Sequence, residues 1–167
     1  ELKVLIDDYI SSSNKILAKI IVDHDSPFLK SIIINKGSKD DIKIGTNIYD
    51  QSYLVGRVIE VNYKTSRVLL LSDLNSKVPV SVEPSSMQSI LSGTGEKFGK
   101  LQYTQRDNFT LSNGNQIYSS GSGGIFKSGI PIGKINFIDD SNESYVLFHS
   151  DFTQLRLVKI VLYENLN

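Results

Sequence analysis

Residues 55–61 read VGRVIEV and residues 132–138 read IGKINFI, so each stretch places a glycine and then a basic residue within an alternating aliphatic pattern. Two more pairs keep this order: GTNIY (45–49) with GNQIY (114–118), and SRVLLLSD (66–73) with SYVLFHSD (144–151). The offset between partners grows from 69 to 78 residues along the chain. This indicates two copies of one β unit, with most of the extra length of the second copy at 120–129. The alternative is a chance self-alignment of an isoleucine-rich β sequence.

Short apolar runs rich in Ile, Val, Leu and Tyr, separated by turn-forming residues, continue on both sides of these pairs. Runs of this length predict strands, and about twelve of them without a convincing helix after residue 14 indicate an all-β fold of barrel or sandwich type. The predicted strands are 16–22, 29–34, 47–49, 55–61, 67–71, 78–82, 89–91, 101–103, 116–118, 132–138, 145–149 and 155–163.

The expected architecture is two small tandem β-barrel-like domains of about six strands each, preceded by a short helix. We assign residues 15–98 to the first domain and 99–167 to the second, because the glycine-rich stretch 92–100 is the natural hinge. The sequence leaves open that a strand crosses over to complete the other barrel.

Residues 1–14 predict the end of a coiled-coil helix. Leu2, Leu5, Ile6 and Tyr9 follow each other at spacings of three and four, which places an apolar stripe on one helix face. The stripe is too short to form a stable helix alone, so we interpret it as the tail of a longer helix.

Composition excludes several classes of function. The 167 residues carry 18 basic and 18 acidic side chains, so a basic surface for nucleic acid is not expected. The absence of cysteine excludes disulfides, thiolate zinc sites and thiol nucleophiles. No apolar run reaches the roughly 20 residues that span a bilayer, so we expect a soluble globular piece.

The stretch SGSGG at 120–124 resembles the nucleophile segment of chymotrypsin-like proteases, and His24, Asp73 and Ser122 occur in the order that such enzymes use. However, His24 stands at the end of the first predicted strand, and the Gly-Asp pair that shapes an oxyanion hole is missing before Ser122. We therefore expect a turn that requires positive φ, and no catalytic residue.

Metal and cofactor sites are also not expected. Asp23 and Asp25 share one face of an extended strand whereas His24 points to the other, so the three side chains do not converge. His149 lies in an apolar run and is interpreted as a half-buried strand histidine. The acidic stretch 139–143 lacks the glycine and final glutamate of a calcium loop, and predicts a hairpin turn.

Motifs across residues 18–162 point to a family. KIIVD (19–23), INKGS (34–38), LVGRV (54–58) and GIPIGKI (129–135) stand in one order, and each motif is weak alone. Together they resemble the extracytoplasmic part of the rod shape-determining protein MreC family.

The resemblance implies two β-barrel domains on the extracytoplasmic, periplasmic face of the bacterial cell membrane, preceded by a membrane anchor and a coiled coil that ends at residues 1–10. It implies a non-enzymatic scaffold of the cell-elongation complex, which binds a class B penicillin-binding protein and favours its active state during peptidoglycan synthesis. The further partners implied are the membrane protein MreD and the filament protein MreB. Self-association is implied through the helix that carries Leu2, Leu5, Ile6 and Tyr9.

The insertion of the second copy is the region that we expect to contact a partner, because the first copy has no counterpart and its apolar pair is unusual at a loop tip. The residues are Gly121, Ser122, Gly123, Gly124, Ile125 and Phe126. The alternative is that Ile125 and Phe126 fold back as a lid on the second barrel. Two other functions stay open: an envelope module that binds glycan or peptidoglycan, and a serine hydrolase that uses Ser122.

Overall fold

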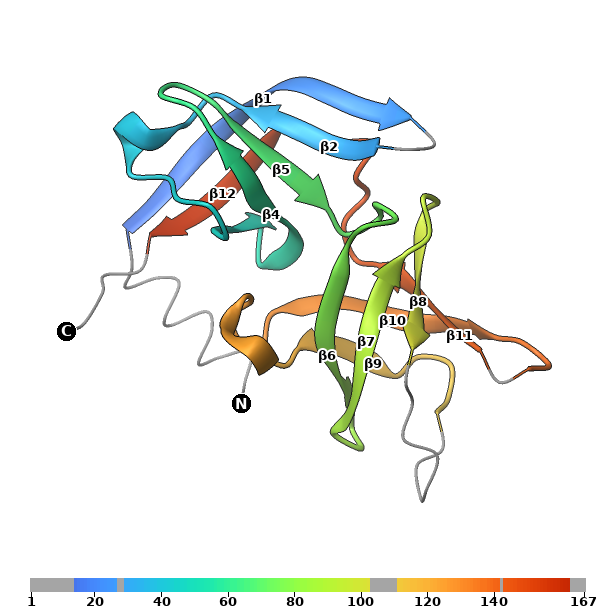
Figure 1. Cartoon of the computed structure of the whole chain (residues 1–167). Helices are drawn as coiled ribbons and strands as arrows, with labels where there is room; N and C mark the ends of the chain where they lie inside the picture. The colour runs from blue at the N-terminus through green and yellow to red at the C-terminus, as the bar shows by residue number, and fades with distance from the viewer. Residues whose placement is uncertain (1–13, 27–28, 103–110, 142, 163–167) are drawn as a thin grey trace.

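The computed structural model describes residues 14–26, 29–102, 111–141 and 143–162, and these form two closed six-stranded β-barrels (Figure 1). The strands of the first copy are β1 (Asn14–Ser26), β2 (Leu29–Ile34), β3 (Asn47–Asp50), β4 (Tyr53–Val61), β5 (Ser66–Leu70) and β6 (Lys77–Glu83). Those of the second copy are β7 (Met87–Gly93), β8 (Phe98–Gln102), β9 (Gln116–Ser119), β10 (Pro131–Ile138), β11 (Ser144–Phe148) and β12 (Leu157–Leu162). All twelve predicted strands overlap these elements, and the all-β prediction is confirmed.

Two short 3-10 helices, η1 (Ser38–Asp40) and η2 (Ser122–Gly124), interrupt the strands. Within the described residues, no helix has the length and apolar character needed to cross a membrane. The predicted helix carrying Leu2, Leu5, Ile6 and Tyr9 lies outside the described residues, and Asn14 already belongs to β1.

The two barrels exchange one strand each. The first closes in the order β1-β12-β3-β4-β5-β2, and the second in the order β10-β11-β8-β7-β6-β9. The two rings have the same order when β1 to β5 are matched with β7 to β11. In this match, β12 takes the place in the first barrel that β6 takes in the second. The sequence repeat is therefore a structural repeat in which the sixth strand of each copy completes the other barrel. In Figure 1 the red β12 lies beside the blue β1, although the two are at opposite ends of the sequence.

This exchange changes the predicted domain division. Strands β6, β7 and β8 belong to the second barrel, so the division of the chain between residues 98 and 99 cuts through that barrel. The expected hinge is a tight turn, because Gly93 at the end of β7 pairs with Gly99 of β8. The first barrel combines residues 14–70 with 157–162, and the second spans residues 77–148.

The repeated Ser-Asp pairs mark the places where the chain crosses between barrels. After β5, the buried carboxylate of Asp73 accepts the backbone N–H of Lys30 at 2.8 Å and that of Asn75 at 2.7 Å. After β11, Asp151 accepts the N–H and the hydroxyl of Thr153 at 3.0 and 2.6 Å. The hydroxyl and the N–H of Thr153 hold the pKa of Asp151 below its ordinary value. Each aspartate thus caps the turn that redirects the chain.

The barrels pack against each other. The core of the second barrel includes Tyr49 and Leu54 from the first barrel, and Phe152 packs against both cores. Across the contact, the rings of Tyr53 and His149 lie 4.9 Å apart, and the Ser150 hydroxyl donates to a carboxylate of the first barrel at 2.9 Å. His149 is exposed, which differs from the half-buried strand position expected, because β11 ends one residue before it.

Candidate functional site

The residues that resemble a protease triad lie in three separate environments. Ser122 is exposed in η2, and its hydroxyl accepts a hydrogen bond from Ser120 at 3.2 Å. His24 is half-buried near the end of β1, where Arg67 donates to its Nδ1 at 3.0 Å. Asp73 is buried, and its carboxylate accepts hydrogen bonds from two backbone N–H groups. The geometry does not support the serine-hydrolase alternative.

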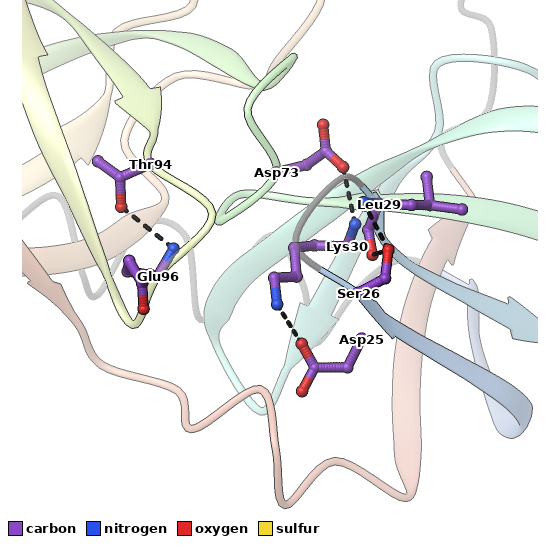
Figure 2. Close-up of polar contacts among 7 residues, drawn as sticks. All are labelled: Asp25, Ser26, Leu29, Lys30, Asp73, Thr94 and Glu96. Carbon is purple, nitrogen blue, oxygen red and sulfur yellow. Dashed lines mark hydrogen bonds and ion pairs between the residues drawn. The ribbon is translucent and has the colours of Figure 1, made fainter.

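A cleft of about 520 Å³ lies between the barrels, and Ser122 is not among the residues that line it. Figure 2 shows residues of both walls: Asp25 and Lys30 at the β1–β2 end, and Glu96 in the turn between β7 and β8, where Thr94 lies next to the cleft lining. Lys30 forms an ion pair with Asp25, and the Thr94 hydroxyl accepts the Glu96 N–H at 3.2 Å. The walls carry charges of both signs, and the side-chain contacts that Figure 2 shows stay within each wall.

Within the part of the chain that the structure describes, no group of three or more His, Cys, Asp or Glu side chains could hold a metal ion. Residues 23–25 lie in β1 and line the cleft at its rim. Their side chains form part of the cleft wall and do not converge on a common metal position.

The loop expected to contact a partner is bound to the first barrel. The side chain of Asn47 in β3 donates to the Ile125 carbonyl at 3.3 Å and accepts the Lys127 N–H at 3.0 Å. Phe126 is 4% exposed and belongs to the core of the second barrel, whereas Ile125 is 52% exposed. Phe126 therefore packs on the core of the second barrel, as the lid alternative expects for this ring, and a partner contact of Phe126 stays a prediction.

The glycines of this loop serve its geometry. Gly121, Gly123 and Gly124 have φ of 77°, 78° and 72°, the left-handed region that glycine adopts without a steric penalty. A partner contact for these glycines and for Ser122 and Ile125, which are partly or fully exposed, stays a prediction.

A different surface, which the sequence interpretation missed, exposes large apolar side chains together. We define the aromatic face as Phe98 of β8, Phe137 of β10, and Tyr145 and Leu147 of β11. Three of these side chains are well exposed: Phe137 at 55%, Leu147 at 41% and Phe98 at 38%. They surround a hollow of about 370 Å³ on the outside of the second barrel.

The sheet register places these side chains side by side. Tyr145 pairs with Phe137 on one side and with Lys100 on the other, and Leu147 pairs with Phe98. Because directly opposite residues point to the same side of a sheet, both rows face outward. The ring of Phe98 meets that of Tyr145 edge-on at 5.4 Å, and the ring of Phe137 stacks on it at 6.0 Å.

Polar groups at the edge of the aromatic face hold it in place. The Tyr145 hydroxyl donates to Asp139 at 3.4 Å, and Lys100 forms an ion pair with Glu143. Partial burial, and then the nearby Asp139 carboxylate, raise the pKa of Tyr145, so its phenol keeps its proton at neutral pH. The hydrogen bond to Glu143 raises the pKa of Lys100, which stays charged.

The alignment of the two copies contains a signal for this face. At matched positions, Glu60 corresponds to Phe137 and Arg67 corresponds to Tyr145. An ion pair in the first copy is thus replaced by two aromatic rings in the second. Exposed aromatics at positions where the same fold takes charges are a sign of an interaction surface.

Comparisons with known proteins agree with this architecture. The family model described as "Rod shape-determining protein MreC, barrel core" matches residues 20–162. A cell shape-determining protein MreC from Cereibacter sphaeroides is 34% identical over 116 residues, which cover 70% of this chain and 38% of that protein. The chain spans about two fifths of the length of such curated relatives.

Solved structures give the same result. The crystal structure of MreC from Pseudomonas aeruginosa superposes with a TM-score of 0.82 at 30% identity and covers 89% of this chain and 99% of that one. A chain from a complex between the penicillin-binding protein PBP2 and MreC of Helicobacter pylori superposes with a TM-score of 0.64. That chain is 13% identical, and the alignment covers 90% of this chain and 99% of that one.

Proposed function

This chain belongs to the MreC family of rod shape-determining proteins, and from that premise we propose that it binds a class B penicillin-binding protein and favours the active state of that enzyme during peptidoglycan synthesis. The family consists of cell-shape scaffolds and not of enzymes. The observation that carries the proposal is the pair of packed barrels, whose fold is shared with the MreC chain of the Helicobacter pylori complex.

The physical role follows from rigidity. Two closed barrels with exchanged strands and a shared core hold their surface loops in fixed relative positions. A partner that samples several conformations is shifted toward the one that fits such a surface best, by the difference in affinity between its states. A scaffold can therefore activate an enzyme without contributing a catalytic group.

We further propose that the protein lies on the extracytoplasmic side and is anchored through an N-terminal membrane segment. It would act in one complex with MreD and MreB. It would self-associate through the segment carrying Leu2, Leu5, Ile6 and Tyr9. These parts rest on family membership alone. An envelope module that binds peptidoglycan is the second candidate, because Phe137 exposes its ring beside the half-buried ring of Tyr145, and exposed aromatic rings are suited to stacking on sugar rings. Shift changes in these rings on titration with muropeptides would favour it.

Acylation kinetics test the proposal. The periplasmic part of the class B penicillin-binding protein of the same bacterium is treated with a fluorescent penicillin while this chain is titrated in. We expect the acylation rate to rise several-fold and to saturate, since the chain stabilises the active state, and we expect an unrelated β protein to have no effect. An acylation rate that stays constant while binding saturates would contradict the proposed activation. The absence of binding would contradict the whole proposal.

A further inference from the structure

The first barrel also exposes large aliphatic side chains together, on the paired strands β1 and β12. Leu17 is 64% exposed, Leu157 is 56% exposed and Ile21 is 52% exposed. Their sequence neighbours Ala18 and Val158 are buried in the core of this barrel. Because side chains alternate along a strand, Leu17 and Leu157 stand on the outer side of the barrel, away from its core.

Lysines alternate with these aliphatic side chains. Lys159 stands opposite Leu17 in the ladder, Lys19 stands opposite Leu157, and Lys15 lies two residues before Leu17 in β1. Directly opposite residues, and residues two apart in one strand, point to the same side of a sheet. We define the basic aliphatic face as the set of these six outward side chains: Leu17, Ile21, Leu157, Lys15, Lys19 and Lys159.

The positive charge of this face is not compensated within the barrel. The ion pairs among the described residues use other basic side chains, and none of them involves the three lysines of the face. Carboxylates of the same barrel are directed elsewhere, since Asp23 and Asp25 line the cleft and Glu60 lies 3.6 Å from the Arg67 guanidinium. The face is therefore locally basic in a chain of zero net charge, and an anionic surface complements it.

We propose that the basic aliphatic face rests on an anionic phospholipid surface. The aliphatic side chains enter the boundary between headgroups and acyl chains, and the lysines extend to the lipid phosphates. This inference goes beyond the proposed function. It concerns direct contact of the first barrel with lipid, and it depends neither on an N-terminal anchor nor on a penicillin-binding protein.

The choice of side chains favours lipid over a protein as the occupant. Lysine is depleted in protein interfaces, where aromatic residues and arginine are enriched. Its flexible, strongly hydrated side chain loses conformational freedom when a rigid partner fixes it, whereas a fluid headgroup layer adjusts to it. The six residues of the face include no aromatic ring and no arginine. A second copy is also disfavoured, because the face against itself brings lysines against lysines.

Shape agrees with a broad, flat occupant. Strands β1 and β12 are neighbours in a closed barrel, whose outer side is convex (Figure 1). None of the six residues lines the cleft between the barrels or the hollow at the aromatic face. Aliphatic side chains on a convex surface can enter a bilayer without leaving an unfilled space beneath them.

A single fluorescent label tests the contact, because the chain contains no cysteine of its own. The polarity-sensitive dye NBD is attached to the variant Leu17→Cys, and extruded vesicles of equal parts phosphatidylglycerol and phosphatidylcholine are added. We expect the emission to rise roughly threefold, since the dye leaves water for the acyl boundary. The matched label at Phe137→Cys, on the outer side of the second barrel, should keep its emission.

Vesicle sedimentation separates the two components of the face. Each lysine near an anionic surface strengthens partitioning about fivefold, so the triple variant Lys15→Gln, Lys19→Gln, Lys159→Gln should bind these vesicles roughly 100-fold more weakly. The double variant Leu17→Gln, Leu157→Gln should bind about tenfold more weakly. All five side chains point away from the barrel core, so both variants should fold. The control Lys134→Gln, Phe137→Gln makes the same kinds of change on the second barrel, and its binding should stay within about twofold of wild type.

Three results would overturn the proposal. The first is that the unmodified chain binds the mixed vesicles no more tightly than pure phosphatidylcholine vesicles. The second is that folded variants of the basic aliphatic face lose no more binding than the control. The third is that the dye at position 17 responds to protein concentration or to the periplasmic part of a penicillin-binding protein, and not to vesicles, which would identify a second copy or a protein partner as the occupant.

Discussion

A chain that ends at Arg156 is expected to lose its first barrel. The deletion removes β12, which pairs with β1 on one side and β3 on the other, and with it the buried side chains of Val158, Ile160 and Val161. Each buried aliphatic side chain contributes roughly 2 kcal/mol or more, and the total approaches the 5–15 kcal/mol by which whole domains are stable. We expect amide hydrogen exchange to show loss of protection in β2 and β5.

A chain that ends at Leu162 is the control, because it keeps β12 and should keep full protection. A synthetic peptide of residues 156–162 added to the shorter chain should restore protection in β2, as a strand supplied by another molecule. Full protection of β2 in the shorter chain without the peptide would contradict the strand exchange.

Replacement of Gly133 by alanine is expected to lower the free energy of unfolding by about 3 kcal/mol. A Cβ at this position would lie 2.2 Å from the backbone oxygen of Leu147, an atom of the neighbouring strand that cannot move without breaking the ladder. Gly56 has the same contact with the oxygen of Leu69 in the first barrel, so Gly56→Ala should cost a similar amount. For a domain of this size, the melting temperature should fall by about 9 °C in calorimetry.

Gly123→Ala separates close approach from backbone conformation. Gly123 has φ of 78°, but a Cβ there would meet no atom within 4 Å. Only the left-handed conformation opposes the substitution, at about 1 kcal/mol. Equal destabilisation by Gly123→Ala and Gly133→Ala would show that the strand contact is not the cause.

Much of this architecture could be predicted from local sequence. The alternation in residues 55–61 and 132–138 determines which side chains face the core, and this predicted both the strands and the repeat. Pairing of β12 with β1 could not be predicted in this way, because Val158 and Ile160 have the same pattern whichever barrel they close. The partner of a strand is decided by long-range packing, and the glycine-rich turn at 93–99 suggested a hinge where the structure has a hairpin.

The candidate surfaces show a similar limit. Composition drew attention to Ile125 and Phe126 as an apolar pair in a loop, but it could not show that Phe126 fills the barrel core while Asn47 holds the loop. The aromatic face is spread over β8, β10 and β11, so its four side chains become one surface only when the register is known. Comparison of Arg67 with Tyr145 in the repeat was the available clue.

Site-specific photo-cross-linking in living cells tests most directly the central claim that this protein binds a class B penicillin-binding protein. The full-length protein is produced in its own bacterium with a photoreactive phenylalanine analogue at Tyr145 of the aromatic face, and in a second strain at Arg67, the matched position of the first barrel. On irradiation we expect an adduct recognised by antibody to the class B penicillin-binding protein from position 145 and none from position 67. An adduct with that protein from position 67 alone, or from neither position while rod shape is maintained, would contradict the account.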